Sequence, residues 1–242
     1  MCTVSWYSQL NEYTLFFNRD ESRNRQPGLP PKIGTSEETQ YICPLDPEGG
    51  GTWLLVNEHG LTLGLLNYYE KQIHYQPGIR QTRGELPLKF ASSKDLPEVE
   101  AVFDKLDLAP YPPLHFLAVD CSGTALLLTW DGQTIIVSYP NWVDLPITTS
   151  SFETSRVVKG RKALFVEEVA LANDQVQAME RFHTGTRPEP DAYSVLMARP
   201  DAKTVSVSRI DVTDTEVRMR YQARPDDKAF LDTPQILTIP RS

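Results

Sequence analysis

The sequence has few cysteines, and none of them stands in a pattern that binds metal. There are three, Cys2, Cys43 and Cys121, with no CxxC pair and no Cys/His spacing around them. The four histidines are equally scattered. A sparse, odd number of thiols is typical of a reducing compartment, so we expect a cytoplasmic protein without a disulfide framework or a metal site.

Long apolar runs and basic clusters are missing as well. No stretch approaches the roughly 20 apolar residues that a membrane-spanning helix needs, and the amino terminus lacks the pattern of a secretory signal. The net charge is −8, and the one short basic group, Arg156 to Lys162, falls in an expected helix. We interpret it as a solvated face, which argues against a nucleic-acid partner and predicts no transmembrane segment.

The residues that are present suit one globular domain over residues 1–242. Hydrophobic residues make up 40% of the chain, and no linker or internal repeat divides it. Helical spacing predicts helices at 95–106 and at roughly 153–182, the second with a break near Asn173 and Asp174. Runs of β-branched and aromatic residues predict strands at 3–8, 13–19, 52–57, 61–67, 114–120, 124–130, 133–139, 191–199, 203–210 and 215–222.

The order of these elements favours one fold class. Blocks of strands are separated by blocks of helix, whereas a doubly wound fold requires strands and helices to alternate. We therefore predict an α+β fold with two antiparallel sheets and helices packed outside. Prolines and a run of glycines predict a long, partly irregular loop over 22–51, and prolines predict a less regular end in the last twenty residues.

The first two predicted strands form a hairpin that brings reactive groups together. With a turn centred between Leu10 and Asn11, opposed residues have numbers that sum to about 21. Cys2 then lies opposite Arg19, and Asp20 is next to Arg19. A thiol, a guanidinium and a carboxylate therefore meet at one end of a sheet.

This combination has a chemical logic. A thiol is a nucleophile only as thiolate, and we expect Arg19 to lower the pKa of Cys2 from the usual value of about 8.5. If Met1 is removed, the α-amine of Cys2 can act as a general base for its own thiol, and Asp20 can orient that amine. The alternative is that Cys2 is only a small residue at the start of a strand.

The same residues resemble a known family. Met1-Cys2-Thr3 with Asn18-Arg19-Asp20-Glu21 is similar to the NRDE family, named for that tetrapeptide and also called the transport and Golgi organisation protein family. The resemblance implies the N-terminal nucleophile hydrolase fold, a four-layer αββα sandwich. Further matches follow in order along nearly the whole chain: Gly51-Thr52-Trp53, Val56-Asn57, Gly60, Asn67-Tyr68, Arg83-Gly84-Glu85-Leu86 and Gly185-Thr186-Arg187.

The stretch 57–67 is also similar to the penicillin V acylase and bile salt hydrolase branch, whose enzymes cleave linear amides with an N-terminal cysteine. By that resemblance Cys2 is the nucleophile, Asp20 holds its α-amine, and Asn67 helps to form the oxyanion hole. Arg19 stands near the conserved arginine of the acylases. Arg187 supports the site from the carboxy-terminal half.

One departure from the acylases concerns the oxyanion hole. The acylases supply an asparagine from a loop before the middle helix, and the corresponding region here, residues 148–152, contains none. Losing one such donor can cost about a hundredfold or more in rate. Ser150 or Ser151 could take the place of this asparagine, through a hydroxyl or through a backbone N–H.

Two functions follow from these observations. The first is an amidohydrolase that needs no cofactor and cleaves a linear carbon–nitrogen amide bond of a small, partly apolar substrate. The alternative is a haem- or lipid-binding trafficking protein on the same scaffold, because the family is linked to membrane traffic and lipid metabolism and haem handling has been proposed. It would use an apolar pocket, with His59, His74 or Cys43 as a ligand. A third interpretation is an inactive homologue, and the sequence leaves the oligomeric state open.

Overall fold

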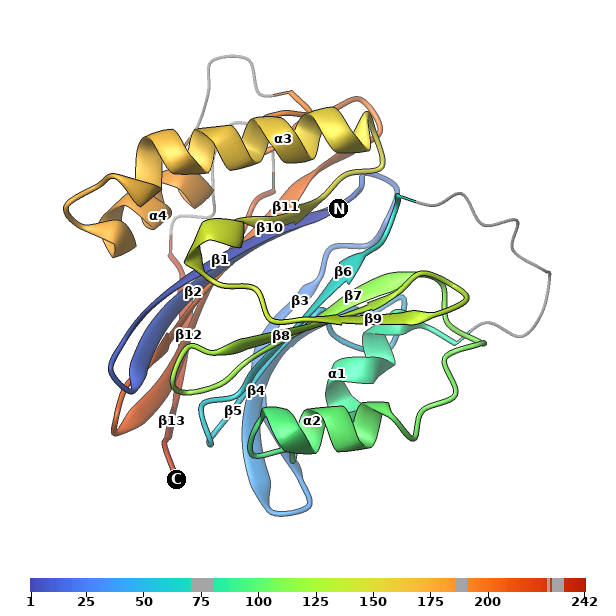
Figure 1. Ribbon diagram of the computed structural model, residues 1–242, viewed down its shortest axis with the longest axis vertical. Coiled ribbons are helices and arrows are strands. Elements are labelled where there is room, and N and C mark those ends of the chain that lie inside the picture. Colours follow the sequence, from blue (N-terminus) through green and yellow to red (C-terminus); the bar gives the residue numbers. More distant parts are fainter. Residues whose placement is uncertain (71–80, 186–190, 226, 228–232) are drawn as a thin grey trace.

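The computed structural model describes residues 1–70, 81–185, 191–225, 227 and 233–242. Two antiparallel β-sheets lie face to face, and helices cover the outer face of each sheet (Figure 1). This is the four-layer αββα arrangement, so the predicted fold class is confirmed.

The first sheet has six strands and carries the amino terminus. The strands lie in the order β10 (Ile147–Thr149), β1 (Cys2–Gln9), β2 (Glu12–Ser22), β11 (Ala202–Val212), β12 (Glu216–Ala223) and β13 (Gln235–Pro240). Its outer face is covered by α3 (Thr154–Phe165), a π-helical turn η3 (Val166–Ala170) and α4 (Gln175–Thr184).

The second sheet has seven strands in chain order. These are β3 (Leu29–Ser36), β4 (Thr39–Leu45), β5 (Leu54–Asn57), β6 (Thr62–Asn67), β7 (Leu114–Val119), β8 (Ala125–Trp130) and β9 (Ile135–Ser138). A 3-10 turn η1 (Arg83–Glu85) leads into α1 (Leu86–Lys89), and α2 (Leu96–Phe103) follows; α1 and α2 pack on the outer face of this sheet. A second 3-10 turn, η2 (Trp142–Asp144), precedes β10.

Most predicted elements are confirmed, including the register of the first hairpin, in which Cys2 is the Cα partner of Arg19. The predicted helix at 95–106 begins where expected, because the Asp95 side chain accepts a hydrogen bond of 2.9 Å from the Glu98 backbone N–H. The predicted break near Asn173 and Asp174 separates η3 from α4. The two short elements β10 and α1 were not predicted, because they have only three and four residues.

The predicted loop over 22–51 is wrong, because it contains β3 and β4. Proline is tolerated there since β3 is an edge strand of its sheet. The predicted irregular end is also wrong in part, because β13 pairs with β12. Conversely, the predicted strand at 191–199 is absent, and of this segment only Ala198 forms an isolated bridge.

Between the sheets lies one apolar core, which includes Cys2, Phe17 and Trp53, and a second core lies under α1 and α2. None of the helices in the described ranges combines the length and the apolarity needed to cross a membrane.

Candidate active site

Cys2 opens β1, between β10 and β2. Its Cα partners are Thr149 on one side and Arg19 on the other, and only 6% of the residue is exposed. The Cys2 backbone N–H donates to Thr149 Oγ1 over 3.2 Å. Alternation along the strands places Cys2 and Arg19 on the face toward the second sheet, and Thr3 and Asp20 on the face toward α3.

Asp20 is buried beside the start of β1 and keeps one unused acceptor. Its Oδ1 accepts a 2.6 Å hydrogen bond from the Thr204 hydroxyl. Its Oδ2 lies 3.6 Å from Nη1 of Arg161 and accepts no hydrogen bond from the described residues. A buried carboxylate oxygen without a donor is costly, so it marks a place where another donor is expected.

Arg161 is the buried counter-charge of Asp20, although the sequence pattern predicted a solvated face for its helix. Its Nη1 donates to the hydroxyls of Thr3 (2.8 Å) and Thr148 (3.1 Å). Its Nη2 donates to the carbonyls of Ala192 (3.2 Å) and Ser194 (2.8 Å). These carbonyls are thereby withdrawn from strand pairing, which explains why segment 191–199 is not a strand. Burial lowers the pKa of Arg161, and the nearby Asp20 carboxylate opposes that effect.

Arg19 is held against an aromatic ring at the entrance to the site. Its guanidinium carbon lies 3.9 Å from the centroid of the Trp53 ring. Its Nη2 makes two long contacts, 3.4 Å to Glu21 and 3.5 Å to Asp46, so neither carboxylate binds it tightly. The indole N–H of Trp53 is buried and donates to no described group.

Asn67 ends β6 and is connected to the amino terminus through a tyrosine. Its Nδ2 donates to the Tyr69 hydroxyl over 2.9 Å, and the α-amine of Met1 donates to the same hydroxyl over 3.3 Å. A primary amide has two N–H donors, so Asn67 keeps one for another acceptor.

These residues share one cavity of about 430 Å³. Four of the five predicted site residues line it, namely Cys2, Arg19, Asp20 and Asn67. The fifth, Arg187, lies outside the described residues. Sequence reasoning did not single out Trp53, which also lines the cavity, or the supporting residues Thr204, Arg161 and Tyr69.

Two of the motif stretches form the rim of this cavity because their backbones touch. A Cβ atom on Gly51 would fall 2.2 Å from the carbonyl carbon of Gly84, so only glycine fits at position 51. The Thr52 backbone N–H donates to the Gly84 carbonyl over 2.8 Å. By contrast, Asn57 has a structural role. Its side chain forms hydrogen bonds to backbone groups of the segment that follows α1 and of the turn between β5 and β6.

The expected substitution of the oxyanion asparagine by Ser150 does not fit the geometry. The Ser150 hydroxyl donates to the Phe152 carbonyl over 2.7 Å and accepts from the Phe152 N–H over 3.1 Å, so the turn before α3 engages it. Ser151 is exposed. Thr149 is the residue of this region that faces Cys2, and it was missed because a three-residue strand gives no readable pattern.

Arg19 lowers the pKa of Cys2, as expected, but burial of the thiol has a larger effect in the opposite direction. Burial raises the pKa of the Cys2 thiol to about 11, and the α-amine and Arg19 only reduce that rise. The thiol is therefore neutral at pH 7 and needs a base. Burial by itself lowers the pKa of the Met1 α-amine, but Cys2, Tyr69 and Asp20 outweigh burial and raise it. With Met1 in place, the amine is thus protonated and cannot be that base.

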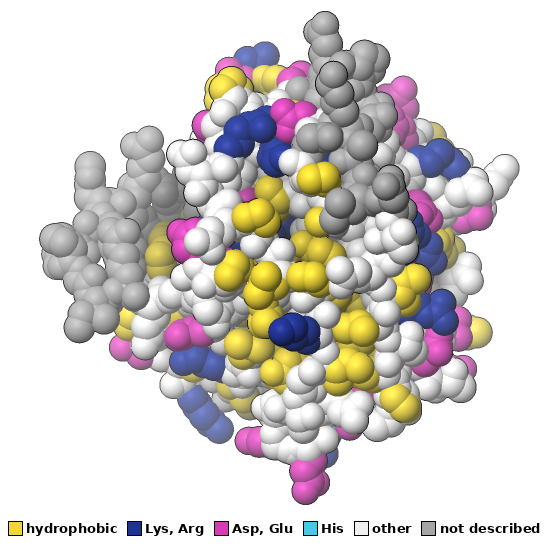
Figure 2. All heavy atoms as spheres, turned by 180° about the vertical axis from the view of Figure 1, so that it is seen from behind, with side chains coloured by type: hydrophobic (Ala, Val, Ile, Leu, Met, Phe, Trp, Pro, Cys, Tyr) yellow, Lys and Arg dark blue, Asp and Glu magenta, His cyan; other side chains and the backbone are white. Residues whose placement is uncertain are grey.

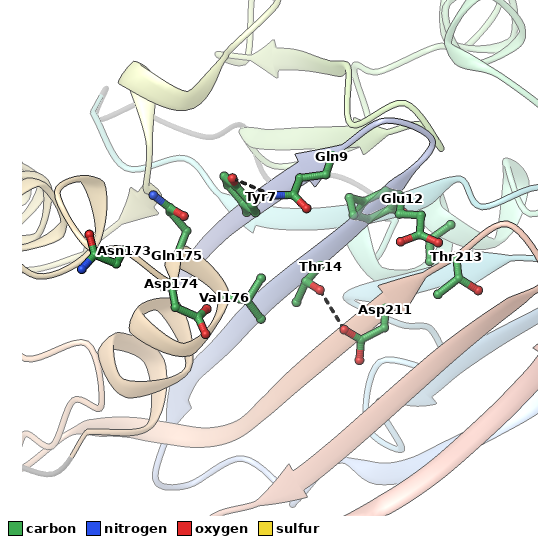
Figure 3. Close-up of a pocket in the computed structure, with 12 residues that line it drawn as sticks. Tyr7, Gln9, Glu12, Thr14, Asn173, Asp174, Gln175, Val176, Asp211 and Thr213 are labelled. Atoms are coloured by element: carbon green, nitrogen blue, oxygen red, sulfur yellow. Dashed lines mark hydrogen bonds between the residues drawn. The ribbon is translucent and has the colours of Figure 1, made fainter.

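A cavity of similar volume lies at the other end of the first hairpin (Figure 3). Tyr7, Glu12 and Asp211 line it, and Thr14 donates to Asp211 over 2.8 Å. It contains no thiol and no cationic side chain among its lining residues. Of these two cavities, only the one at Cys2 is lined by a thiol and by cationic side chains.

The predicted haem ligands do not meet at the site. Cys43 is buried in the core under α1 and α2, and His59 bonds to Ser242 and Thr39. His74 lies outside the described residues. Within the described ranges no group of three or more His, Cys, Asp or Glu side chains could hold a metal ion.

Solved structures share this architecture. Penicillin V acylase from Agrobacterium tumefaciens superimposes with a TM-score of 0.57 at 12% identity, over 99% of this chain and 86% of that one. A mutant of conjugated bile acid hydrolase from Clostridium perfringens superimposes with a TM-score of 0.58 at 12% identity, over 99% of this chain and 92% of that one. The Caenorhabditis elegans ortholog of N-acylethanolamine-hydrolyzing acid amidase superimposes with a TM-score of 0.54 at 11% identity, over 87% of this chain and 92% of that one. At such identities the similarity shows the fold, which is that of the N-terminal nucleophile hydrolases.

No curated protein sequence matches the chain. The model of one protein family matches residues 1–188, which include β1, β2, Asn67 and the rim glycines. Its description is Transport and Golgi organisation 2. The chain therefore belongs to the Transport and Golgi organisation 2 family, as its NRDE motif predicts.

Proposed function

We propose that the protein is an N-terminal-cysteine amidohydrolase that cleaves a linear amide bond of a small, partly apolar substrate. The observation that supports this most is Oδ2 of Asp20, which accepts no hydrogen bond from the described residues and belongs to a residue that lines the same cavity as Cys2. An α-amine at Cys2 is a donor of the kind that this oxygen lacks. The three structures with this fold are named as an acylase, a hydrolase and the ortholog of an amidase.

The mechanism requires the α-amine to lie on Cys2, after hydrolysis of the Met1–Cys2 bond. The amine, held by Thr149 Oγ1 and Asp20 Oδ2, takes the thiol proton, which is necessary because a thiol is a nucleophile only as thiolate. The thiolate attacks the substrate carbonyl, and the free N–H of Asn67 donates to the developing oxyanion. The amine then returns the proton to the leaving nitrogen. Water, activated by the same amine, hydrolyses the thioester.

The remaining roles follow from position. Arg19 lies at the entrance over Trp53 and attracts an acceptor group of the acyl half of the substrate. Arg161 does not line the cavity; it is a positioning residue whose Nη1 lies 3.6 Å from Oδ2 of Asp20. For Arg187 we propose the supporting role that the family resemblance implies.

The test compares chains with a proven Cys2 amino terminus on a set of N-acyl amides. Cys2→Ala should lower turnover by about 10⁴-fold or more, since the nucleophile is lost. Intact mass should show an acyl adduct on the unmutated chain. The matched control is Cys121→Ala, because Cys121 is a free thiol that does not line the cavity. Full turnover by Cys2→Ala would contradict the proposal.

One observation favours the carrier function as a second candidate. Apolar side chains gather on the rear of the molecule (Figure 2). Leu29, Ile33 and Ile236 are among the exposed large apolar side chains of the described residues. A cavity of about 540 Å³ is lined by Val205, Tyr221 and several prolines, with Arg23 and Lys203 among the lining residues. The separated positions of Cys43 and His59 favour a lipid over haem.

A titration separates the two candidates. Haem or a fluorescent fatty acid is added to the unmutated chain and to Cys2→Ala. Saturable binding that is equal in both chains, without amide hydrolysis by either, would favour the carrier. Cys2-dependent hydrolysis would favour the enzyme.

A further inference from the structure

Met1 occupies a site with specific contacts, although it is the residue whose removal the mechanism requires. Its backbone extends the β1–β2 ladder by one residue, because the Asp20 N–H donates to the Met1 carbonyl over 2.9 Å and the Met1 amine donates to the Asp20 carbonyl over 3.2 Å. Only 7% of Met1 is exposed. Met197, Ala202 and Tyr69 pack around it, and Arg199 Nη1 lies 3.6 Å from its sulfur.

Met1 also lies between two cavities. It lines the cavity of about 430 Å³ that contains Cys2, and it lines a second one of about 290 Å³. Asp20 and Glu21 line both as well, whereas Tyr69 and Ala202 line only the second. Met1 is therefore a wall that the two cavities share, and we expect its removal to open space beside the nitrogen of Cys2.

The chemistry determines which half of a substrate enters the vacated space. In the proposed mechanism the α-amine of Cys2 protonates the leaving nitrogen, so that nitrogen must lie within hydrogen-bond distance of the amine. The space next to the amine is the space that Met1 leaves. The leaving amine therefore enters the Met1 site, and the acyl half lies in the cavity with Arg19 and Trp53.

We propose that hydrolysis of the Met1–Cys2 bond converts the Met1 site into the subsite for the leaving amine, and that this amine is an α-amino acid derivative with a short, unbranched side chain. The step consumes one water molecule, releases methionine and leaves the amine on Cys2. The freed N–H and C=O of Asp20 then pair with the backbone-like groups of the leaving amine, as they pair with Met1. Met197, Ala202 and Tyr69 accept the linear side chain.

This inference rests on the proposed function, but its central test measures binding without catalysis. Cys2→Ala chains are prepared without Met1 and, by synthesis with an aminopeptidase inhibitor, with Met1; intact mass verifies both. Calorimetry then measures the binding of norleucine amide and valine amide. The chain without Met1 should bind norleucine amide about tenfold or more tightly than the β-branched valine amide, and the chain with Met1 should bind neither.

A variant of the subsite sharpens the test. Ala202→Leu in the chain without Met1 should weaken the binding of norleucine amide about tenfold, because the larger side chain fills the space for the linear chain. The matched control is Ala172→Leu, since Ala172 lines neither cavity. Thermal unfolding verifies that both variants are folded.

Two outcomes would overturn the inference. One is equal binding of the two amides, and the other is equal binding by chains with and without Met1. Cys2-dependent hydrolysis of N-acyl amides together with either outcome would leave the proposed function intact. The expected binding without any hydrolysis would support the subsite and contradict the proposed function.

Discussion

The two outer layers of the sandwich differ in their buried polar groups. Under α1 and α2 three aromatic rings pack together, Phe90 after α1, Phe103 on α2 and Phe116 on β7, with centroids of Phe90 and Phe116 4.7 Å apart and those of Phe103 and Phe116 5.8 Å apart. The layer of α3 and α4 also contains aromatic contacts, but it adds buried polar side chains that face the first sheet, among them Arg161 on α3 and His183 on α4, both with 0% exposure. The polar layer is the one behind Cys2.

The difference shows what each layer does. Apolar packing is non-directional, and it stabilises the second sheet without fixing a particular atom. Hydrogen bonds have a direction, and those of Arg161 fix Thr3 and Thr148 beside Cys2, while its guanidinium lies 3.6 Å from the Asp20 carboxylate. We infer that the polar layer positions the nucleophile at a cost in stability, because transferring charged groups from water to the protein interior is unfavourable.

The largest effect is expected from breaking the polar layer at its centre. Arg161→Met leaves the buried Asp20 carboxylate without its counter-charge and should lower the free energy of unfolding by about 3–5 kcal/mol. Urea unfolding measures it. In the double variant with Asp20→Asn the loss should be smaller than the sum of the two single losses, since no charge is left unpaired. Additive losses would show that the two side chains are not coupled.

A smaller effect is expected from acid. The His183 ring bonds to Ser5 and Asn18, each over 2.7 Å, and burial, with Arg161 nearby, lowers the pKa of His183 to about 3. Because the ordinary pKa is 6.5, the unfolded chain binds more protons than the folded one between these values. Stability should therefore fall as the pH falls from 6.5, by up to about 1.4 kcal/mol per pH unit for this group.

The measurement is the free energy of unfolding at several pH values between 4 and 6.5. The control is His183→Gln, which keeps a side chain that can form hydrogen bonds but cannot be protonated in this range. The free energy of unfolding of this variant should depend less on pH. Some pH dependence remains, because burial lowers the pKa of His115 to about 4. An unchanged slope would show that His183 is not the group that is protonated.

The smallest effect is expected in the apolar layer. Phe103→Leu replaces one buried ring by a smaller apolar side chain and should cost about 1 kcal/mol, because neighbouring rings can adjust. The rate at which iodoacetamide alkylates Cys2 should not change. A change in that rate would mean that the apolar layer also positions the nucleophile, which would contradict the comparison.

Much of the fold could be predicted because its evidence is local. The hairpin register follows from one short turn, and it places Cys2 opposite Arg19. The start of α2 follows from Asp95 and Glu98. The strands within 22–51 could not be predicted, because proline in β3 is acceptable only when one knows that β3 is at an edge.

The site divides in the same way. The sequence by itself determined the meeting of Cys2, Arg19 and Asp20, because that depends on a strand period of two and on a short hairpin. The order of strand and helix patterns predicted the fold class, and the motifs carried the family resemblance. Only the tertiary structure decided that Arg161 is buried, that Thr149 faces Cys2, and that Met1 separates two cavities. Those facts depend on contacts between residues that are more than 100 positions apart, such as Arg161 with Thr3 and Thr149 with Cys2, and no local pattern records them.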